Sequence, residues 1–181
     1  MNFDKRSQID VTELIVNGYK VEKMTDSRYC VRFDGVKASP YEGGVWNVLV
    51  HLGRHYPFKP PVVRFMNYIY HPNVHTDYGI IYLDVLNDDK WSPVYNLCDI
   101  FQTFIPQLLN SPNPYDAINE EAADLFLNDM VQYTTIVELF IKYYATEDAL
   151  IERGNTSYDT EEEGYGNITS DSDEERLSSF F

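Results

Sequence analysis

The chain has 181 residues, of which 44% are apolar and 15% aromatic, a composition typical of one globular domain rather than of a disordered protein. Its formal net charge of -15 and the lack of any basic stripe along the sequence argue against nucleic-acid binding. The sequence has no membrane-spanning apolar run, no signal core at the N-terminus and no C-x-x-C spacing, which predicts a cytoplasmic or nuclear protein without a disulfide framework or a metal site.

The first part of the sequence predicts one helix followed by four strands. Val11, Leu14 and Ile15 are spaced as the apolar face of a short helix, which Gly18 ends. Alternating apolar residues then predict strands at residues 19–24, 29–33, 46–52 and 62–66. Because tight turns such as P-Y-E-G-G at residues 40–44 separate these strands, we expect an antiparallel meander.

The second part predicts helices after a long irregular region at residues 67–96, and long loops of this kind are commonly functional. Asn96 can cap a helix with an apolar stripe over residues 100–109, and Pro106 inside it is expected to remove a backbone donor and kink the helix. Two more helices are predicted, at residues 117–127 and 131–151. This order predicts an α+β fold with the helices packed on one side of the sheet.

The C-terminal residues differ in composition from the rest. From Glu147 to the end there are 11 acidic residues and two arginines, a charge of -9. With few large aliphatic side chains, this stretch is predicted not to bury enough apolar surface to offset its ordering entropy. We therefore predict a core domain at residues 1–152 and a disordered acidic tail at residues 153–181, in which Ser170 and Ser172 suit an acidophilic kinase.

Five short motifs occur in a characteristic order. They are Y-P-F-K-P-P at residues 56–61, H-P-N at 71–73, G-x-x-Y-L-D-V-L at 79–86, W-S-P at 91–93 and P-N-P at 112–114. With this order and spacing the chain resembles ubiquitin-conjugating (E2) enzymes over residues 11–149, which implies the UBC fold. Y-E-G-G-V-W at residues 41–46, Y-A-T-E at 144–147 and the acidic tail are similar to the E2 H type.

Tyr82 stands where this family carries its thioester-forming cysteine. A phenol has a pKa of about 10 against about 8.5 for a thiol, and the thiolate is the better nucleophile. The other positions match an active member. By resemblance, Asn73 would stabilise the oxyanion and His71 would shape the turn that aims it. Asp116 matches the acidic gate for the incoming lysine, and Asp84 matches the acid after the nucleophile.

The resemblance also implies partners. Phe58 matches the loop aromatic that fills the groove of a RING-type E3 ligase, and a second E3-binding loop matches Ser92, Pro93 and Val94. The first helix belongs to the same E3-binding patch, to which it contributes Lys5 and Arg6. In this family the helix also engages E1 through basic residues, and since it offers only these two, E1 binding is predicted to be weakened. The expected function is that of an inactive E2 variant that binds an E3 ligase or ubiquitin, with no membrane partner and no cofactor, since only the upstream E1 uses ATP.

Two alternatives stay open at this point. In the first, the chain still conjugates ubiquitin through another nucleophile. The candidates are Cys98, in the first turn of a helix whose dipole would lower its thiol pKa, and then Cys30, on a strand. In the second alternative, the fold is an interaction module unrelated to ubiquitin. Charging by E1 separates the inactive variant from the enzyme, and binding to ubiquitin or to a RING domain separates both from the module.

Overall fold

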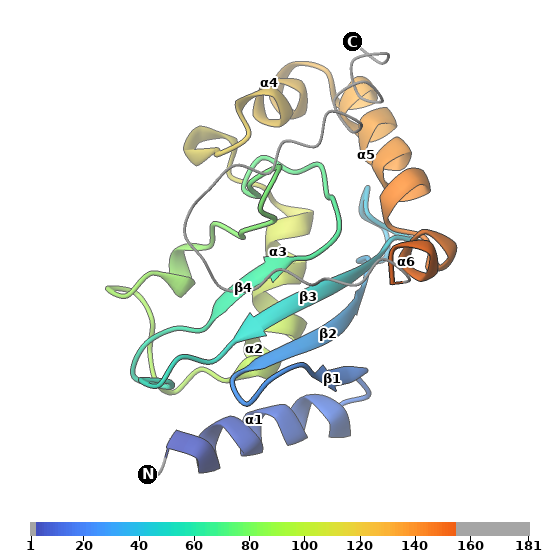
Figure 1. The fold of residues 1–181 in the computed structure, drawn as a ribbon. Coiled ribbons are helices and arrows are strands. Elements are labelled where there is room, and N and C mark those ends of the chain that lie inside the picture. Colours follow the sequence, from blue (N-terminus) through green and yellow to red (C-terminus); the bar gives the residue numbers. More distant parts are fainter. Residues whose placement is uncertain (1–2, 155–181) are drawn as a thin grey trace.

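The computed structural model describes residues 3–154. Helix α1 (Phe3–Val16) precedes a four-stranded antiparallel sheet in the order β1 (Val21–Lys23), β2 (Arg28–Asp34), β3 (Val45–His51) and β4 (Val62–Phe65) (Figure 1). Short turns follow at η1 (Asp84–Leu86) and η3 (Pro114–Asp116), and the helical elements are α2 (Leu97–Asp99), η2 (Ile100–Phe104), α3 (Ile105–Asn110), α4 (Glu120–Asn128), α5 (Met130–Tyr144) and α6 (Glu147–Gly154). The predicted α+β fold with its four-stranded meander is confirmed.

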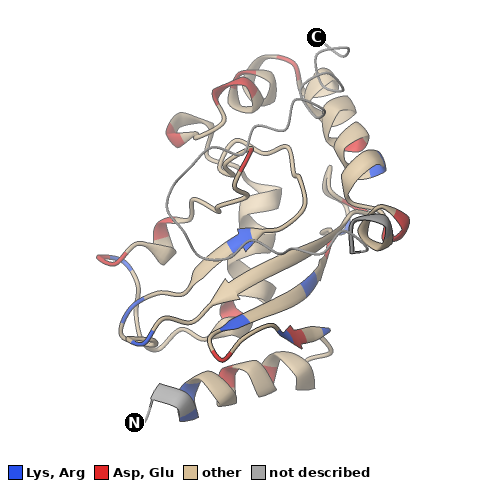
Figure 2. Ribbon diagram, in the orientation of Figure 1, with Lys and Arg blue, Asp and Glu red and all other residues tan. Residues whose placement is uncertain are grey.

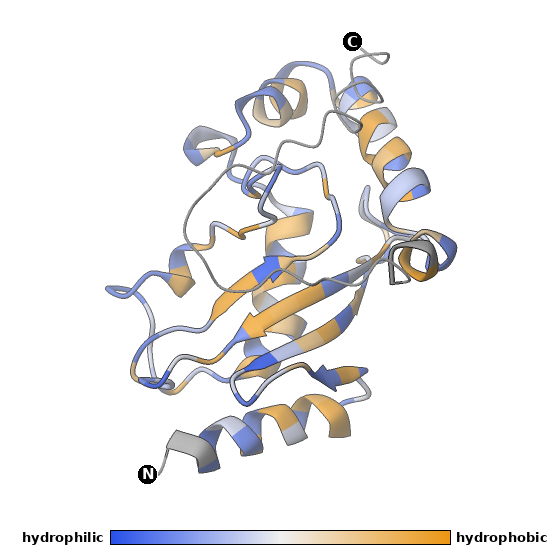
Figure 3. Cartoon of the chain, viewed as in Figure 1, coloured by the Kyte–Doolittle hydropathy of each residue, from blue (hydrophilic) through white to orange (hydrophobic). Residues whose placement is uncertain are grey.

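The core lies between one face of the sheet and the segment from α2 to α3, which runs behind the sheet in Figure 1. Tyr29, Val31 and Phe33 of β2 are buried on this face, as their alternation predicted. The following strand, largely hydrophobic in Figure 3, buries Trp46, Val48 and Val50. The rings of Phe33 and Phe101 pack with centroids 6.4 Å apart, so aromatic side chains join the sheet to the helices.

Helix α1 departs from the prediction at one residue. Leu14 is fully buried, and Gly18, with a φ of 89°, ends the helix as expected. Ile15 is 53% exposed, so its assignment to the apolar face was wrong. The next residue of a helix is turned by about 100°. Because α1 is covered only along a narrow line, the turn from Leu14 to Ile15 is enough to bring the side chain into solvent.

The helix that follows Asn96 begins as predicted. The Asn96 side chain accepts the backbone N–H of Asp99, and the Asp99 side chain accepts that of Asn96, which forms a capping box. The chain then forms a π-helical turn at Ile100–Phe104, directly before Pro106. Since proline has no N–H to donate, the irregularity expected at Pro106 takes the form of a widened turn.

The last predicted helix, at residues 131–151, is two helices, α5 and α6. The backbone leaves the helical conformation at Ala145, where φ is -134°. The carbonyl of Ala145 accepts the N–H of Val45 at 2.8 Å, and the carbonyl of Tyr144 accepts the side-chain amide of Asn67. These contacts to β3 and to the segment after β4 divide the helix, and periodicity alone could not have revealed them.

The helix predicted at residues 117–127 begins later, at Glu120. The N–H groups of Ile118 and Asn119 both donate to the carbonyl of Pro72, at 2.9 and 3.0 Å, and the Asn119 side chain caps α4. The start of α4 is thereby attached to the H-P-N motif.

Of the acidic tail predicted at residues 153–181, only residues 153–154, at the end of α6, belong to the described part of the chain. Ser170 and Ser172 lie outside it.

Candidate functional site

His71 is a fully buried, neutral residue at the start of the H-P-N turn (residues 71–73). Its Nδ1 accepts the backbone N–H of Asn73 at 2.9 Å, so the proton is on Nε2, which donates to the carbonyl of Leu108 at 3.1 Å. Burial lowers the pKa of His71 to about 4. The ring therefore joins the H-P-N turn to α3 without carrying a charge near neutral pH.

Asn73 joins the same turn to η3. Its Oδ1 accepts the N–H of Asn113 at 2.8 Å, and its Nδ2 donates to the carbonyls of Asn113 and Asp116, at 2.8 and 3.0 Å. The side chain is buried, and both of its amide hydrogens are engaged. The amide predicted to stabilise an oxyanion thus acts here as a clamp between two loops.

Tyr82 lies beside this clamp. Its N–H donates to the carbonyl of Asn73 at 2.9 Å, and the buried Ile81 forms an isolated β-bridge with Val74. Gly79, with a φ of 64°, passes so close to β4 that a Cβ there would lie 2.0 Å from the carbonyl oxygen of Phe65. The backbone is therefore held from Gly79 up to Tyr82, while the Tyr82 side chain is 50% exposed.

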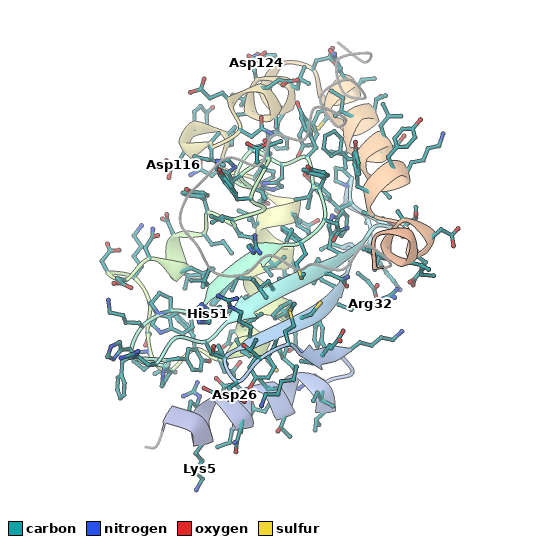
Figure 4. The ribbon with its side chains drawn as sticks, viewed as in Figure 1. Lys5, Asp26, Arg32, His51, Asp116 and Asp124 are labelled. Carbon is teal, nitrogen blue, oxygen red and sulfur yellow. The ribbon has the colours of Figure 1, made fainter. Side chains whose placement is uncertain are left out.

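Asp84, one of the two predicted acidic residues, pairs with a lysine that sequence analysis missed. Lys90 forms an ion pair with Asp84 at 2.5 Å. The hydrogen bond to Asp84 raises the pKa of Lys90 most, followed by the charges of Asp84, Asp89 and Asp116. Asp116 is exposed on η3, near α4 in Figure 4. The only signal for this lysine was the D-D-K run at residues 88–90, between two of the motifs.

A cleft of about 560 Å³ opens next to Tyr82. It is mostly apolar and is lined by Leu83, Asp84, Val85, Phe104, Gln107, Leu108 and Ser111. It begins one residue after Tyr82 and lies against the end of η2 and against α3. The described residues contain no group of three or more His, Cys, Asp or Glu that could hold a metal ion.

Neither cysteine belongs to this site. Cys30 is on β2, where burial, with a smaller effect of Glu22, raises its thiol pKa to about 11. Burial also raises the pKa of Cys98 on α2, and nearby carboxylates such as that of Glu13 add to the increase. The Cys98 thiol is therefore not activated by its position near a helix N-terminus.

The family model for ubiquitin-conjugating enzymes matches residues 5–141, which include the H-P-N turn, Tyr82 and η3. The chain belongs to the ubiquitin-conjugating enzyme (E2) family. It is 41% identical over 172 residues to ubiquitin-conjugating enzyme E2 5 of Arabidopsis thaliana, with 94% of this chain and 92% of the relative covered. It is 44% identical over 143 residues to ubiquitin-conjugating enzyme E2-23 kDa of Triticum aestivum, with 78% and 77% covered. The predicted family is confirmed.

In this E2 the two loops predicted to bind a ligase lie together. The indole N–H of Trp91 donates to the carbonyl of Pro57 at 2.6 Å, which joins one loop to the other. Phe58 is 74% exposed and Val94 is 82% exposed, so neither folds inward. We name the group of Phe58, Ser92, Pro93 and Val94 the Phe58 surface. Within residues 3–154 of this E2, no helix has the length and hydrophobicity needed to span a membrane.

Arg6 is a largely buried residue that joins α1 of the E2 to the loop carrying Pro93 of the Phe58 surface. Its guanidinium donates to the carbonyls of Pro93 and Tyr95, at 3.1 and 2.8 Å, and pairs with the buried Asp10 at 2.7 Å. The hydroxyl of Tyr56 also donates to Asp10. Only 16% of the Arg6 side chain is exposed, so we leave it out of the partner-binding residues. Lys5 remains exposed and points away from the body of the molecule in Figure 4.

Arg6→Ala is expected to lower the free energy of unfolding by about 2–4 kcal/mol, because it removes the cation that balances a buried carboxylate. Chemical denaturation monitored by tryptophan fluorescence measures the change. Lys5→Ala removes an exposed charge from the same helix turn, and it should change stability by less than about 0.5 kcal/mol. Equal effects of the two substitutions would show that Arg6 has no internal role.

Proposed function

We propose that this E2 is a catalytically inactive variant that binds an E3 ligase or ubiquitin non-covalently and thereby modulates protein ubiquitination. Tyr82 carries the proposal, because a phenol stands among the matching motifs at the position where the family has its thiol. The alternative of another nucleophile is disfavoured, since both cysteines lie on other elements and have raised thiol pKa values.

Lys90 supports the same proposal. A lysine that attacks a thioester must first lose its proton. The ion pair with Asp84 instead keeps Lys90 charged and raises its pKa. An incoming lysine would have to compete with Lys90 for the carboxylate of Asp84. Asp84 therefore serves an internal ion pair rather than a substrate.

The finer assignments are also proposals. We assign the chain to the E2 H type on the Y-E-G-G-V-W and Y-A-T-E motifs. The first motif contains Tyr41, which is fully buried and whose hydroxyl forms a hydrogen bond with the hydroxyl of Tyr133 at 2.6 Å.

We expect weakened E1 binding, because Lys5 is the one exposed cation of α1. We also expect action in the cytoplasm or nucleus without a cofactor of its own.

Competition for a RING-type ligase tests the proposal. Wild-type protein added to a ubiquitination reaction, with E1, an active E2 and each of a panel of RING domains, should slow the reaction. Phe58→Ala should need at least about tenfold more protein for the same inhibition, since an exposed aromatic anchor contributes about 2 kcal/mol or more to such an interface. Val131→Ala, which removes a similarly exposed apolar side chain from α5, should inhibit like the wild type.

The other outcomes also decide between the hypotheses. Unchanged inhibition by Phe58→Ala would place the ligase-binding surface elsewhere on the molecule. Binding to neither a RING domain nor ubiquitin would favour an interaction module unrelated to ubiquitin. Turnover by the added protein alone, without the active E2, would show that it is an enzyme after all.

A further inference from the structure

The sheet face that points away from the helices gathers cations that are scattered in the sequence. Arg28, Cys30 and Arg32 alternate with buried residues of β2 and therefore share this face. Residues that pair with these across the sheet lie on the same face. Arg28 pairs with His51 of β3, which pairs with Val62 of β4. Cys30 pairs with Leu49 of β3, which pairs with Arg64 of β4. We name these seven residues the outer face. Figure 2 shows its arginines on β2 and β4, and Figure 4 shows His51 and Arg32 on it.

Two of these arginines have no counter-ion in the described part of the chain. Arg32 pairs with Asp34 and Glu147, whereas no ion pair within residues 3–154 involves Arg28 or Arg64. Besides the two acids that pair with Arg32, Glu22 of β1 lies level with Cys30. Unpaired arginines beside the exposed Val62 suit an acidic segment that also carries some apolar side chains.

The chain contains such a segment. Residues 155–181 hold eight acidic residues and one arginine, a charge of -7, and end in two phenylalanines. The described chain ends at α6, whose first residue, Glu147, binds Arg32 at the edge of the outer face (Figure 1). From Arg32, Arg28 is four residues along β2, or about 14 Å, and β4 is about 10 Å across the sheet. The 17 residues from 154 to 171 can span up to about 60 Å, so the acidic run at residues 171–175 reaches both arginines.

We propose that the acidic segment at residues 159–175 docks on the outer face of its own chain and pairs with Arg28 and Arg64. The docked segment then competes with other acidic partners for the same two arginines. Because the pairing is between surface charges, it weakens as salt increases. Phosphate on Ser170 or Ser172 adds negative charge next to the acidic run and strengthens the docking. The proposal does not depend on whether the chain is an active enzyme.

A spin label in the full-length protein tests this contact. The label is attached at Ser172→Cys in a chain that also carries Cys30→Ser and Cys98→Ser. At low salt it should reduce the amide signals of residues 28–32, 49 and 64 at least twofold relative to those of α4. Arg28→Glu combined with Arg64→Glu, or 1 M sodium chloride, should abolish the reduction. Lys37→Glu with Arg54→Glu changes the charge equally in the loops after β2 and β3, and should leave the reduction in place.

A second variant controls for the possibility that the arginine substitutions disturb the folding of the sheet. Amide replacements at residues 171, 173, 174 and 175 leave the sheet untouched and should also abolish the signal loss. The proposal is overturned if the signal loss is absent or uniform over the surface, or if it survives both sets of charge changes. The proposal is also overturned if the amide signals of the outer face shift when ubiquitin is added but are not reduced by the spin label.

Discussion

Tyr82→Cys is expected to form a reductant-sensitive adduct with ubiquitin in the presence of E1 and ATP, whereas the wild type forms none. The substitution places a thiol where the motifs require one, and a thiolate accepts an acyl group that a phenol does not. Non-reducing gels of the two proteins, run with and without thiol reductant, measure the outcome. The expected change is from background to a majority of the protein charged.

This expectation rests on how the backbone is held at position 82. The bond from its N–H to Asn73, the bridge of Ile81 to Val74 and the close approach of Gly79 to β4 do not involve the side chain. Since the Tyr82 side chain is half exposed, its replacement should change stability by less than about 1 kcal/mol. The adduct should therefore form on an unchanged scaffold.

Three control variants make the result specific. Tyr82→Ser should give an ester that resists thiols, and Tyr82→Phe should give no adduct. Adding Cys30→Ser and Cys98→Ser to Tyr82→Cys should leave charging intact. Charging of the wild type would contradict the proposed inactivity and direct attention to the two cysteines. Failure of a folded Tyr82→Cys protein would mean that more than the nucleophile is lost, and the proposed weak binding of E1 at the helix that carries Lys5 would be measured next.

Lowering the pH from 8 to 5 is expected to reduce the free energy of unfolding by about 2 kcal/mol through His71 alone. In the folded protein burial lowers the pKa of His71 to about 4, against about 6.5 in the unfolded chain. Between these values the unfolded chain binds the proton and the folded chain does not. The stability from the neutral ring is therefore complete above about pH 6.5 and is lost as the pH falls towards 4.

His71→Gln separates this effect from the other titrating groups. The glutamine amide offers a donor and an acceptor but does not titrate in this range. Urea denaturation of both proteins at pH 8, 6.5 and 5 should give a stability difference that narrows by about 2 kcal/mol over the series. His51, whose pKa burial and Arg28 also lower, is present in both proteins and cancels. A constant difference would mean that the ring does not titrate as its burial requires.

Much of the fold was predictable because its signals are local. The alternation in β2 and β3 and the capping side chain of Asn96 belong to neighbouring residues. Two of the failures show the effect of distant contacts. Ile15 is exposed because the contacts of α1 are narrow, and the break between α5 and α6 depends on a bond from Val45, a hundred residues away in sequence. Such contacts leave no trace in the periodicity of the helix itself.

For the site, the motifs predicted which residues gather but not what they bind. His71, Asn73 and Tyr82 do meet in one place. The engagement of the Asn73 amide could not be foreseen, because two of its partners are backbone carbonyls, which any residue supplies. The same holds for Arg6, which binds two carbonyls of the loop after residue 91. Lys90 was missed because a charged residue in a loop does not indicate which of several acids it pairs with.

The half-exposed side chain at position 82 also bears on the history of such a chain. Its neighbours are buried or bonded through the backbone, so the residue on which the chemistry depends contributes little to folding. A single mutation can therefore remove the reaction without exposing the protein to degradation, and the scaffold persists for selection to use in another way. The reverse mutation is equally accessible, so loss of activity at this position need not be permanent.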